Sequence, residues 1–219
     1  YFNNNQRILY FLQSNGLRIV SYPSDLPALK KINHLRIDEL LLMTEQGNYL
    51  VFDTKTKKTT ILSLPGSVEV SVDPLSYNSL YFLFNGDLYI FEIGTGQSRI
   101  LKKNVQSFTL LPHRIYYVNG QGLWYFDKYH FFIAEDLTLV SPDVKSAREI
   151  ALSPNEKRVI YSQKKRLYIY DIEKNKHDFL DLDRVVKQVT WLDNNNFWIY
   201  SEKATICQAV FLTCHTPVP

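Results

Sequence analysis

Residues 158–171 predict the fold, and they read RVIYSQKKRLYIYD. Two apolar and aromatic runs, 158–162 and 167–171, flank the polar connector 163–166. Runs of strand length that are rich in Val, Ile and Tyr and are joined by a short polar turn are typical of a β-hairpin. We therefore predict a pair of antiparallel strands in this stretch.

The same hairpin pattern recurs along the chain. Two further clear copies are LYFLFNGDLYIFE at 80–92 and IYYVNGQGLWYFD at 115–127. Weaker copies begin near residues 8, 41 and 198. The residues that lead the second strand of the six copies are Leu17, Tyr49, Leu88, Leu123, Leu167 and Ile206. Their mean separation of about 38 residues, together with apolar runs of strand length, is typical of the blades of a propeller.

Turn residues and flanking segments extend each hairpin. Asn15-Gly16, Asn85-Gly86 and Asn119-Gly120 lie in three of the six connectors, and Asn-Gly tolerates the positive φ angles of a type I′ turn. A short strand-like segment such as 149–152 precedes the hairpin, and another such as 60–64 follows it. Four antiparallel strands in each repeat form the blade of a β-propeller.

We therefore predict an all-β protein, a single β-propeller domain of about six four-stranded antiparallel blades. The approximate units are 1–33, 34–66, 67–103, 104–145, 146–184 and 185–219. Residues 1–5 resemble 191–196, which precede the second strand of the last unit. From this likeness we expect the chain to begin at the end of an innermost strand, so that the propeller is incomplete or belongs to a longer chain.

One repeat also resembles a known family. The stretch LSPNEKRVIYS at 152–162, followed by LYIYD at 167–171, is similar to the S-P-D-G-K-x-I-A-Y-S … I-Y-V-x-D repeat of TolB-type, WD-repeat-like bacterial propellers. Asn155-Glu156 replaces the Asp-Gly of that repeat, and the Trp-Asp and Gly-His pairs of true WD repeats are absent. The resemblance implies a bacterial, extracytoplasmic propeller but no particular function, because propellers serve as scaffolds, lectins, hydrolases and gating domains alike.

Composition excludes several other classes of protein. The net charge is +3 over 219 residues, whereas nucleic-acid-binding proteins concentrate their basic residues in one patch or tail. There is no apolar run of the length that spans a membrane, so we expect no membrane insertion by this segment. Both cysteines, Cys207 and Cys214, lie near the C-terminal end, so no disulfide framework holds the body of the chain together.

Chemical motifs are sparse. The five histidines lack paired metal-ligand spacing, and neither a G-x-S-x-G elbow nor a phosphate-binding loop occurs. We therefore expect no metal and no cofactor. Propeller glycosidases need two carboxylates beside the channel, and Glu69 and Glu149 lie on predicted innermost strands. Under the other interpretation, these two side chains are solvated residues that alternate with core positions.

Two segments are candidates for binding a partner. Lys164, Lys165 and Arg166 lie in a predicted hairpin tip, where they would face an acidic partner. Tyr129 and Phe131 belong to an aromatic segment that the other repeats lack, and this segment forms either an interaction patch or part of the core. We predict a non-catalytic protein-interaction or scaffold module whose partner is an unidentified protein. The alternatives are a carbohydrate-active propeller, either glycosidase or lectin, and the gating domain of a hydrolase.

Overall fold

The computed structural model describes residues 2–13, 16–65, 68–128, 138–141, 144–147, 149–182, 185–201, 204–208 and 213–215. These residues form six antiparallel β-sheets and contain no α-helix, which confirms the all-β prediction. Within this part of the chain no helix could span a lipid bilayer. The chain forms two compact units, Tyr1–Lys103 and Asn104–Pro219. Whether they make a single domain stays a prediction.

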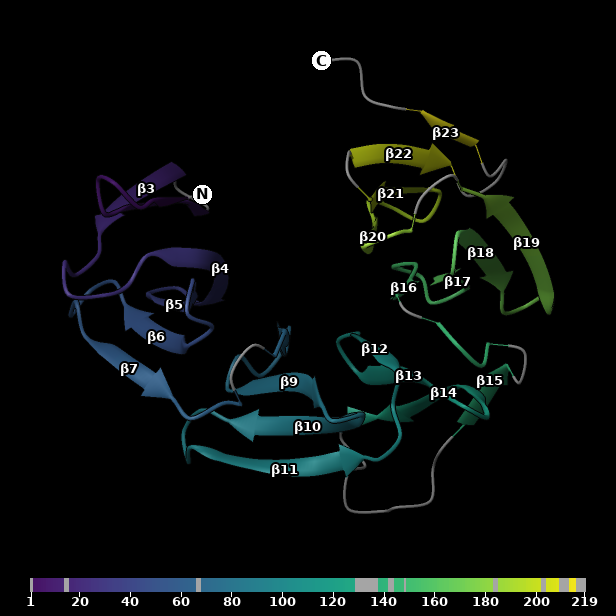
Figure 1. Cartoon of the computed structure of the whole chain (residues 1–219), viewed down its shortest axis with the longest axis horizontal. Helices are drawn as coiled ribbons and strands as arrows, with labels where there is room; N and C mark the ends of the chain where they lie inside the picture. The colour runs from purple at the N-terminus through teal and green to yellow at the C-terminus, as the bar shows by residue number, and fades with distance from the viewer. Residues whose placement is uncertain are drawn as a thin grey trace. The chain divides into compact units, whose positions relative to one another are not determined.

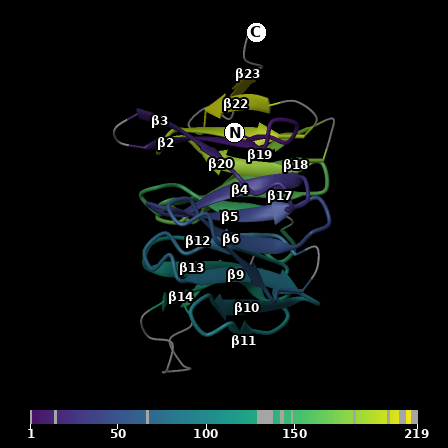
Figure 2. The same ribbon diagram turned by 90° about the vertical axis from the view of Figure 1, so that its left-hand side faces the viewer.

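The first unit contains three sheets (Figures 1 and 2). Their strands are β1 (Phe2–Asn3), β2 (Ile8–Gln13) and β3 (Gly16–Ser21); β4 (Leu29–Arg36), β5 (Glu39–Thr44), β6 (Tyr49–Asp53) and β7 (Thr59–Leu62); and β8 (Val70–Val72), β9 (Ser79–Phe84), β10 (Asp87–Glu92) and β11 (Gln97–Lys102). In each sheet the strands lie side by side in chain order, as Figure 2 shows for β4, β5 and β6.

The second unit also contains three sheets (Figure 1). Their strands are β12 (Ser107–Leu110), β13 (Arg114–Asn119), β14 (Gly122–Asp127) and β15 (Thr138–Ser141); β16 (Ile150–Leu152), β17 (Arg158–Gln163), β18 (Arg166–Asp171) and β19 (Lys176–Asp181); and β20 (Gln188–Trp191), β21 (Asn196–Tyr200), β22 (Ala204–Gln208) and β23 (Thr213–His215). Each sheet again follows chain order from its first strand to its fourth.

Five of the six sheets have four strands, as predicted, but the first has three. Its first strand, β1, has two residues in the described part of the chain. No fourth strand follows β3 in this sheet. The Tyr22 amide donates to the Arg7 carbonyl, which extends the pairing of β2 with β3, and the chain then turns, with the Leu26 amide donating to the Pro23 carbonyl. The next strand, β4, belongs to the second sheet, and the approximate boundary between residues 33 and 34 falls inside it.

The middle strands are apolar on both faces because each face packs against a neighbouring sheet. In β5, Leu40 and Leu42 pack in a core with Leu9 and Val20 of the first sheet. The intervening Leu41 and Met43 pack in a second core with residues of β8, β9 and β10. The side chains of a strand alternate between its faces, so an unbroken apolar run marks a strand covered on both sides.

The second unit repeats this arrangement around the β16–β19 sheet. Val159 and Tyr161 of β17 pack in a core with side chains of β13 and β14. Ile160, which lies between them in the chain, packs with side chains of β20, β21 and β22. Each core therefore belongs to two sheets at once. A single sheet would leave one apolar face in water.

The three predicted Asn-Gly turns do not all form as expected. Asn85 and Gly86 form a two-residue turn, because Phe84 pairs with Asp87, and both have positive φ, 51° and 81°. Asn119 instead ends β13 and pairs with Gly122, so the turn there is Gly120-Gln121. The Asn119 side chain explains the shift, because its Oδ1 accepts hydrogen bonds from the amides of Gln121 and Gly122 at 2.9 and 3.2 Å. Asn15 lies outside the described residues.

Gly86 and Gly94 allow the effect of positive φ to be measured. A Cβ at either position meets nothing within 4 Å, but only Gly86 has positive φ, at +81°. We expect Gly86→Ala to lower the free energy of unfolding by about 1 kcal/mol and Gly94→Ala to raise it by about 0.5 kcal/mol. Urea denaturation of both variants measures the two changes. Equal losses at the two positions would show that backbone conformation does not set the cost.

Candidate interaction site

The tip of the β17–β18 hairpin carries the predicted basic residues. Gln163 pairs with Arg166 across the two strands, so Lys164 and Lys165 form the two-residue turn. The backbone of this turn is anchored, because the Leu182 amide donates to the Lys165 carbonyl at 2.7 Å. Lys164 has a φ of 54°, in the left-handed region that such turns require. The strands thus fix the turn while both lysine side chains remain exposed.

Arg166 is held in place beside the two lysines. Its Nε contacts Oδ1 of Asp181, the residue directly opposite on β19. Its guanidinium also lies over the ring of Phe179, 4.8 Å from the centroid. The hydrogen bond to Asp181 is the main reason that the pKa of Arg166 is raised above its ordinary value. Arg166 is therefore a positioned, permanent cation.

Three aromatic side chains pack together beside the hairpin tip, and one of them, Tyr168, lines the site. The ring of Tyr168 stacks on that of Tyr161, with centroids 4.8 Å apart and planes within 4°. Phe179 lies against Tyr168 at 6.1 Å, and 54% of it is exposed. An open hollow of about 500 Å³ adjoins this hairpin, and it is lined by Gln163, Lys164, Lys165, Arg166, Tyr168, Asp181 and Leu182. All three predicted cations therefore border one hollow.

A second hollow, of about 570 Å³, is bordered by the ends of β13 and β14 and by the β16–β17 turn. Its main cation is already paired. Arg114 Nε lies 3.0 Å from Asp127 Oδ1, and its Nη1 lies 2.9 Å from Glu156 Oε2. The Tyr116 hydroxyl donates to the same Glu156 oxygen at 3.0 Å, and burial is the main cause of the raised pKa of Tyr116. This network fastens the β12–β15 sheet to the β16–β19 sheet.

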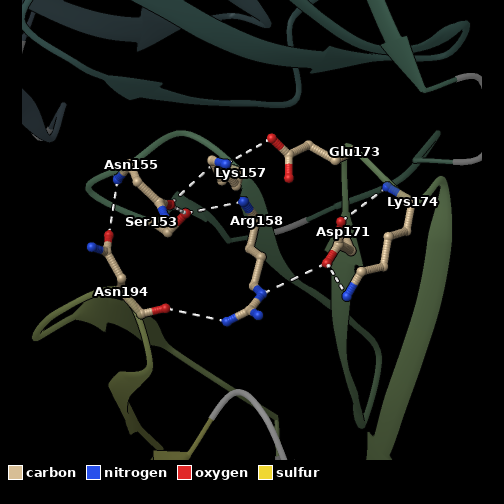
Figure 3. A network of polar contacts seen from close by, with 8 residues as sticks. All are labelled: Ser153, Asn155, Lys157, Arg158, Asp171, Glu173, Lys174 and Asn194. Carbon is tan, nitrogen blue, oxygen red and sulfur yellow. Dashed lines mark hydrogen bonds and ion pairs between the residues drawn. The ribbon is translucent and has the colours of Figure 1, made fainter.

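The turn that carries the family resemblance also binds the next sheet, as Figure 3 shows. The Asn155 amide donates to Oδ1 of Asn194 at 3.0 Å, and Arg158 donates to the Asn194 carbonyl at 3.3 Å. Within the turn, Ser153 Oγ accepts from the Arg158 amide at 3.0 Å. Arg158 also faces Asp171, its partner in the strand register. The turn therefore links the β16–β19 sheet to the β20–β23 sheet through hydrogen bonds.

Glu156 stands where the resembling repeat has glycine, and its φ is 59°. A residue with a Cβ in this region costs roughly 1 kcal/mol. The contacts of its carboxylate with Arg114 and Tyr116 offset that cost. The departure from the family pattern thus has a structural reason, because a glycine would leave Arg114 without its partner on the neighbouring sheet.

Glu69 and Glu149, the candidate carboxylates of a glycosidase, belong to different units. Each lies one residue before a first strand, β8 or β16, rather than within it. The side chain of Glu69 is 81% exposed and its Oε1 lies 2.7 Å from Lys31 Nζ. The Glu149 carbonyl accepts from the Ser162 amide at 3.0 Å. Their catalytic role stays a prediction.

The remaining candidate residues from the sequence are not among the described residues that line either hollow. Tyr129 and Phe131 are not among the residues that the structure describes. Cys207 is buried and disulfide-bonded, and the chain's only other cysteine, Cys214, is its register partner on β23. In the described part of the chain, no three His, Cys, Asp or Glu side chains come together as a metal site would require.

Sequence reasoning missed Phe179, Asp181 and Tyr168 as members of the site. The register brings them there, because Tyr168 pairs with Phe179 and Arg166 with Asp181. The signal lay in residues 176–181, which read KHDFLD. Two large apolar residues, Phe179 and Leu180, follow each other there among polar ones, so their side chains lie on opposite faces of the strand.

The Arg114 network predicts a measurable coupling between two sheets. We expect Arg114→Met to lower the free energy of unfolding by about 1–2 kcal/mol, and a double-mutant cycle with Glu156→Gln to show about 1 kcal/mol of coupling. Lys157→Met is the matched control, because the Lys157–Glu173 pair is 54% and 60% exposed and should contribute less than about 0.5 kcal/mol. Absence of coupling would mean that Arg114 does not join the sheets.

Comparison with known proteins shows which solved structures have a similar fold. No protein-family model matches the sequence, and no curated protein matches it. Among solved structures the chain is similar to hydrazine synthase of Kuenenia stuttgartiensis (13% identity, TM-score 0.63), covering 88% of this chain and 66% of that one. It is also similar to Hsv2 of Kluyveromyces lactis (14% identity, TM-score 0.62), covering 95% of this chain and 72% of that one.

A third similar structure is the extracellular domain of a putative one-component system from B. thetaiotaomicron (10% identity, TM-score 0.64). The match covers 98% of this chain but 33% of that one, so the chain spans about a third of the length of that extracellular domain. All three structures are propeller folds. At these identities the likeness concerns the fold alone, and the chain therefore has a propeller-like fold of antiparallel sheets.

Proposed function

We propose that the protein is a non-catalytic interaction or scaffold module that binds a protein partner at the tip of the β17–β18 hairpin. One observation carries this proposal: three cations and the ring of Tyr168 line a single open hollow, and the exposed ring of Phe179 lies against Arg166 and Tyr168. Binding residues are commonly presented by turns on a rigid scaffold. The TolB-like resemblance adds an expectation of a bacterial, extracytoplasmic setting.

The polar groups around the second hollow support a structural role for it. Asp127 and Glu156 both contact the guanidinium of Arg114. A general acid must be free to give up a proton to its substrate, whereas both carboxylates accept hydrogen bonds from Arg114, and the one to Glu156 joins two sheets. We therefore assign binding to the hairpin tip and assign the Arg114 hollow to stability.

A carbohydrate-active propeller is the second candidate. The exposed ring of Phe179, which lies against Tyr168, offers an apolar surface of the kind on which a sugar ring packs. Glu69 and Glu149 remain the carboxylates that a glycosidase would use. The gating domain of a hydrolase is a third candidate, and it predicts a catalytic domain encoded in the same gene.

Site-specific photo-crosslinking tests the proposed function. Benzoylphenylalanine replaces Phe179, which keeps an aromatic side chain in the site. Ile100 is the matched control, because it is 45% exposed and pairs with Tyr89 as Phe179 pairs with Tyr168. In the cells that make the protein, we expect a discrete protein adduct at position 179 that Lys164→Glu with Lys165→Glu removes, and no such adduct at position 100.

A glycan array and an assay of glycan hydrolysis test the competing proposal. Glycan binding without a protein adduct would contradict the proposed function. Hydrolysis that is lost in Glu69→Gln or Glu149→Gln would contradict it as well, and would identify the protein as a glycosidase.

A further inference from the structure

We propose that the partner presents an acidic peptide in extended conformation, which adds as a fifth strand to the free edge of β19 with its carboxylates facing the hairpin tip. This inference rests on the proposed function and names the chemistry of the partner. It combines two features of one sheet: an open edge strand and a cluster of cations at one end of that strand.

The edge of β19 is available for pairing. β19 pairs with β18 through all six of its residues, and it is the last strand of its sheet. Among the described residues no strand pairs with its other side. An edge strand therefore presents a row of backbone donors and acceptors to a peptide. The 54% exposure of Phe179 adds an apolar contact on the same strand.

The cations lie at the C-terminal end of that strand. Arg166 is directly opposite Asp181, the last residue of β19, and Lys164 and Lys165 precede it in the turn. Gln163 donates to Ser146, which brings the segment of exposed Lys145 to the same end. Among the described residues, the acids at this end are Asp181, already paired with Arg166, and Glu149. The cations therefore outnumber the acids, which favours a partner with carboxylates at this end.

Two other fourth strands show what is specific to β19. Ile61 of β7 and Ile100 of β11 are 74% and 45% exposed, and they occupy the register position of Phe179. The hairpin tips of those sheets read Glu45-Gln46-Gly47 and Asn85-Gly86, and neither contains a cation. An exposed apolar residue is thus common to three edges, but only β19 has it beside a basic turn.

Peptide binding followed by fluorescence anisotropy tests the inference on the full chain. The probe is a fluorescein-labelled decapeptide of alternating Glu and Val. We expect it to bind, and Lys164→Glu with Lys165→Glu to weaken the affinity at least about tenfold. Lys30→Glu with Lys103→Glu is the control, because both lysines are exposed and the net charge changes equally. This control should alter the affinity less than about twofold.

Two N-methylated versions of the decapeptide test strand pairing. One carries N-methyl groups on the odd residues and the other on the even residues, so that each removes the amide donors of one peptide edge. We expect one version to lose binding and the other to retain it. A sulfated heparin oligosaccharide is the third probe, since it carries negative charge but has no amide edge to pair, and we expect it to bind more weakly than the peptide.

Three results would overturn the inference: no binding of the decapeptide to the unaltered chain, equal binding of both N-methylated versions, or a heparin oligosaccharide that binds more tightly than the peptide. A protein adduct at position 179 without decapeptide binding would overturn this inference while the proposed function stands. Thermal unfolding of each variant shows whether it remains folded, and Phe179→Ser provides a second site variant that alters no charge.

Discussion

The packing of neighbouring sheets against both faces of their middle strands is the constraint on which the structure depends. In β5 and β17, consecutive side chains enter two different cores. Apolar burial contributes about 25 cal/mol for each Å² removed from water, and a strand buried on one side gains only half of it. Each sheet is therefore stabilised by its neighbours. Polar contacts, such as the Arg114–Glu156 ion pair and the Asn155–Asn194 hydrogen bond, link neighbouring sheets that also share a core.

The same constraint leaves the fourth strands with little to pack against. β7, β11 and β19 expose most of their side chains, because their sheets are covered mainly over the middle strands. The backbone amides and carbonyls on the outer edge of these strands can then pair with another chain instead of with a strand of the same sheet. At β19 this edge coincides with a basic turn and an exposed Phe179, which connects the fold to the proposed interaction.

Sequence alone predicted the hairpins well, because their middle strands contain nearly continuous apolar and aromatic runs and are joined by turns such as Asn85-Gly86. It placed Lys164, Lys165 and Arg166 at a hairpin tip, where the structure has them. The turn at Asn119 was predicted one residue early, since the side chain of Asn119 caps the turn instead of entering it. The partners of Arg166 on β19 could not be assigned to it from the sequence, because the pairing depends on the strand register. Arg114 and Glu156 are 42 residues apart, and only tertiary packing brings them together.

Amide hydrogen exchange, resolved to single residues, tests the central claim most directly. Strands buried on both faces open only with large parts of the structure, whereas an unpaired edge exchanges quickly. The account predicts strong protection throughout β5, β9, β13 and β17 and an alternating pattern along β19, in which the amides that face β18 are protected and the others exchange fast. Uniform protection along β19 would contradict it, because the edge proposed to receive the peptide would then already be covered.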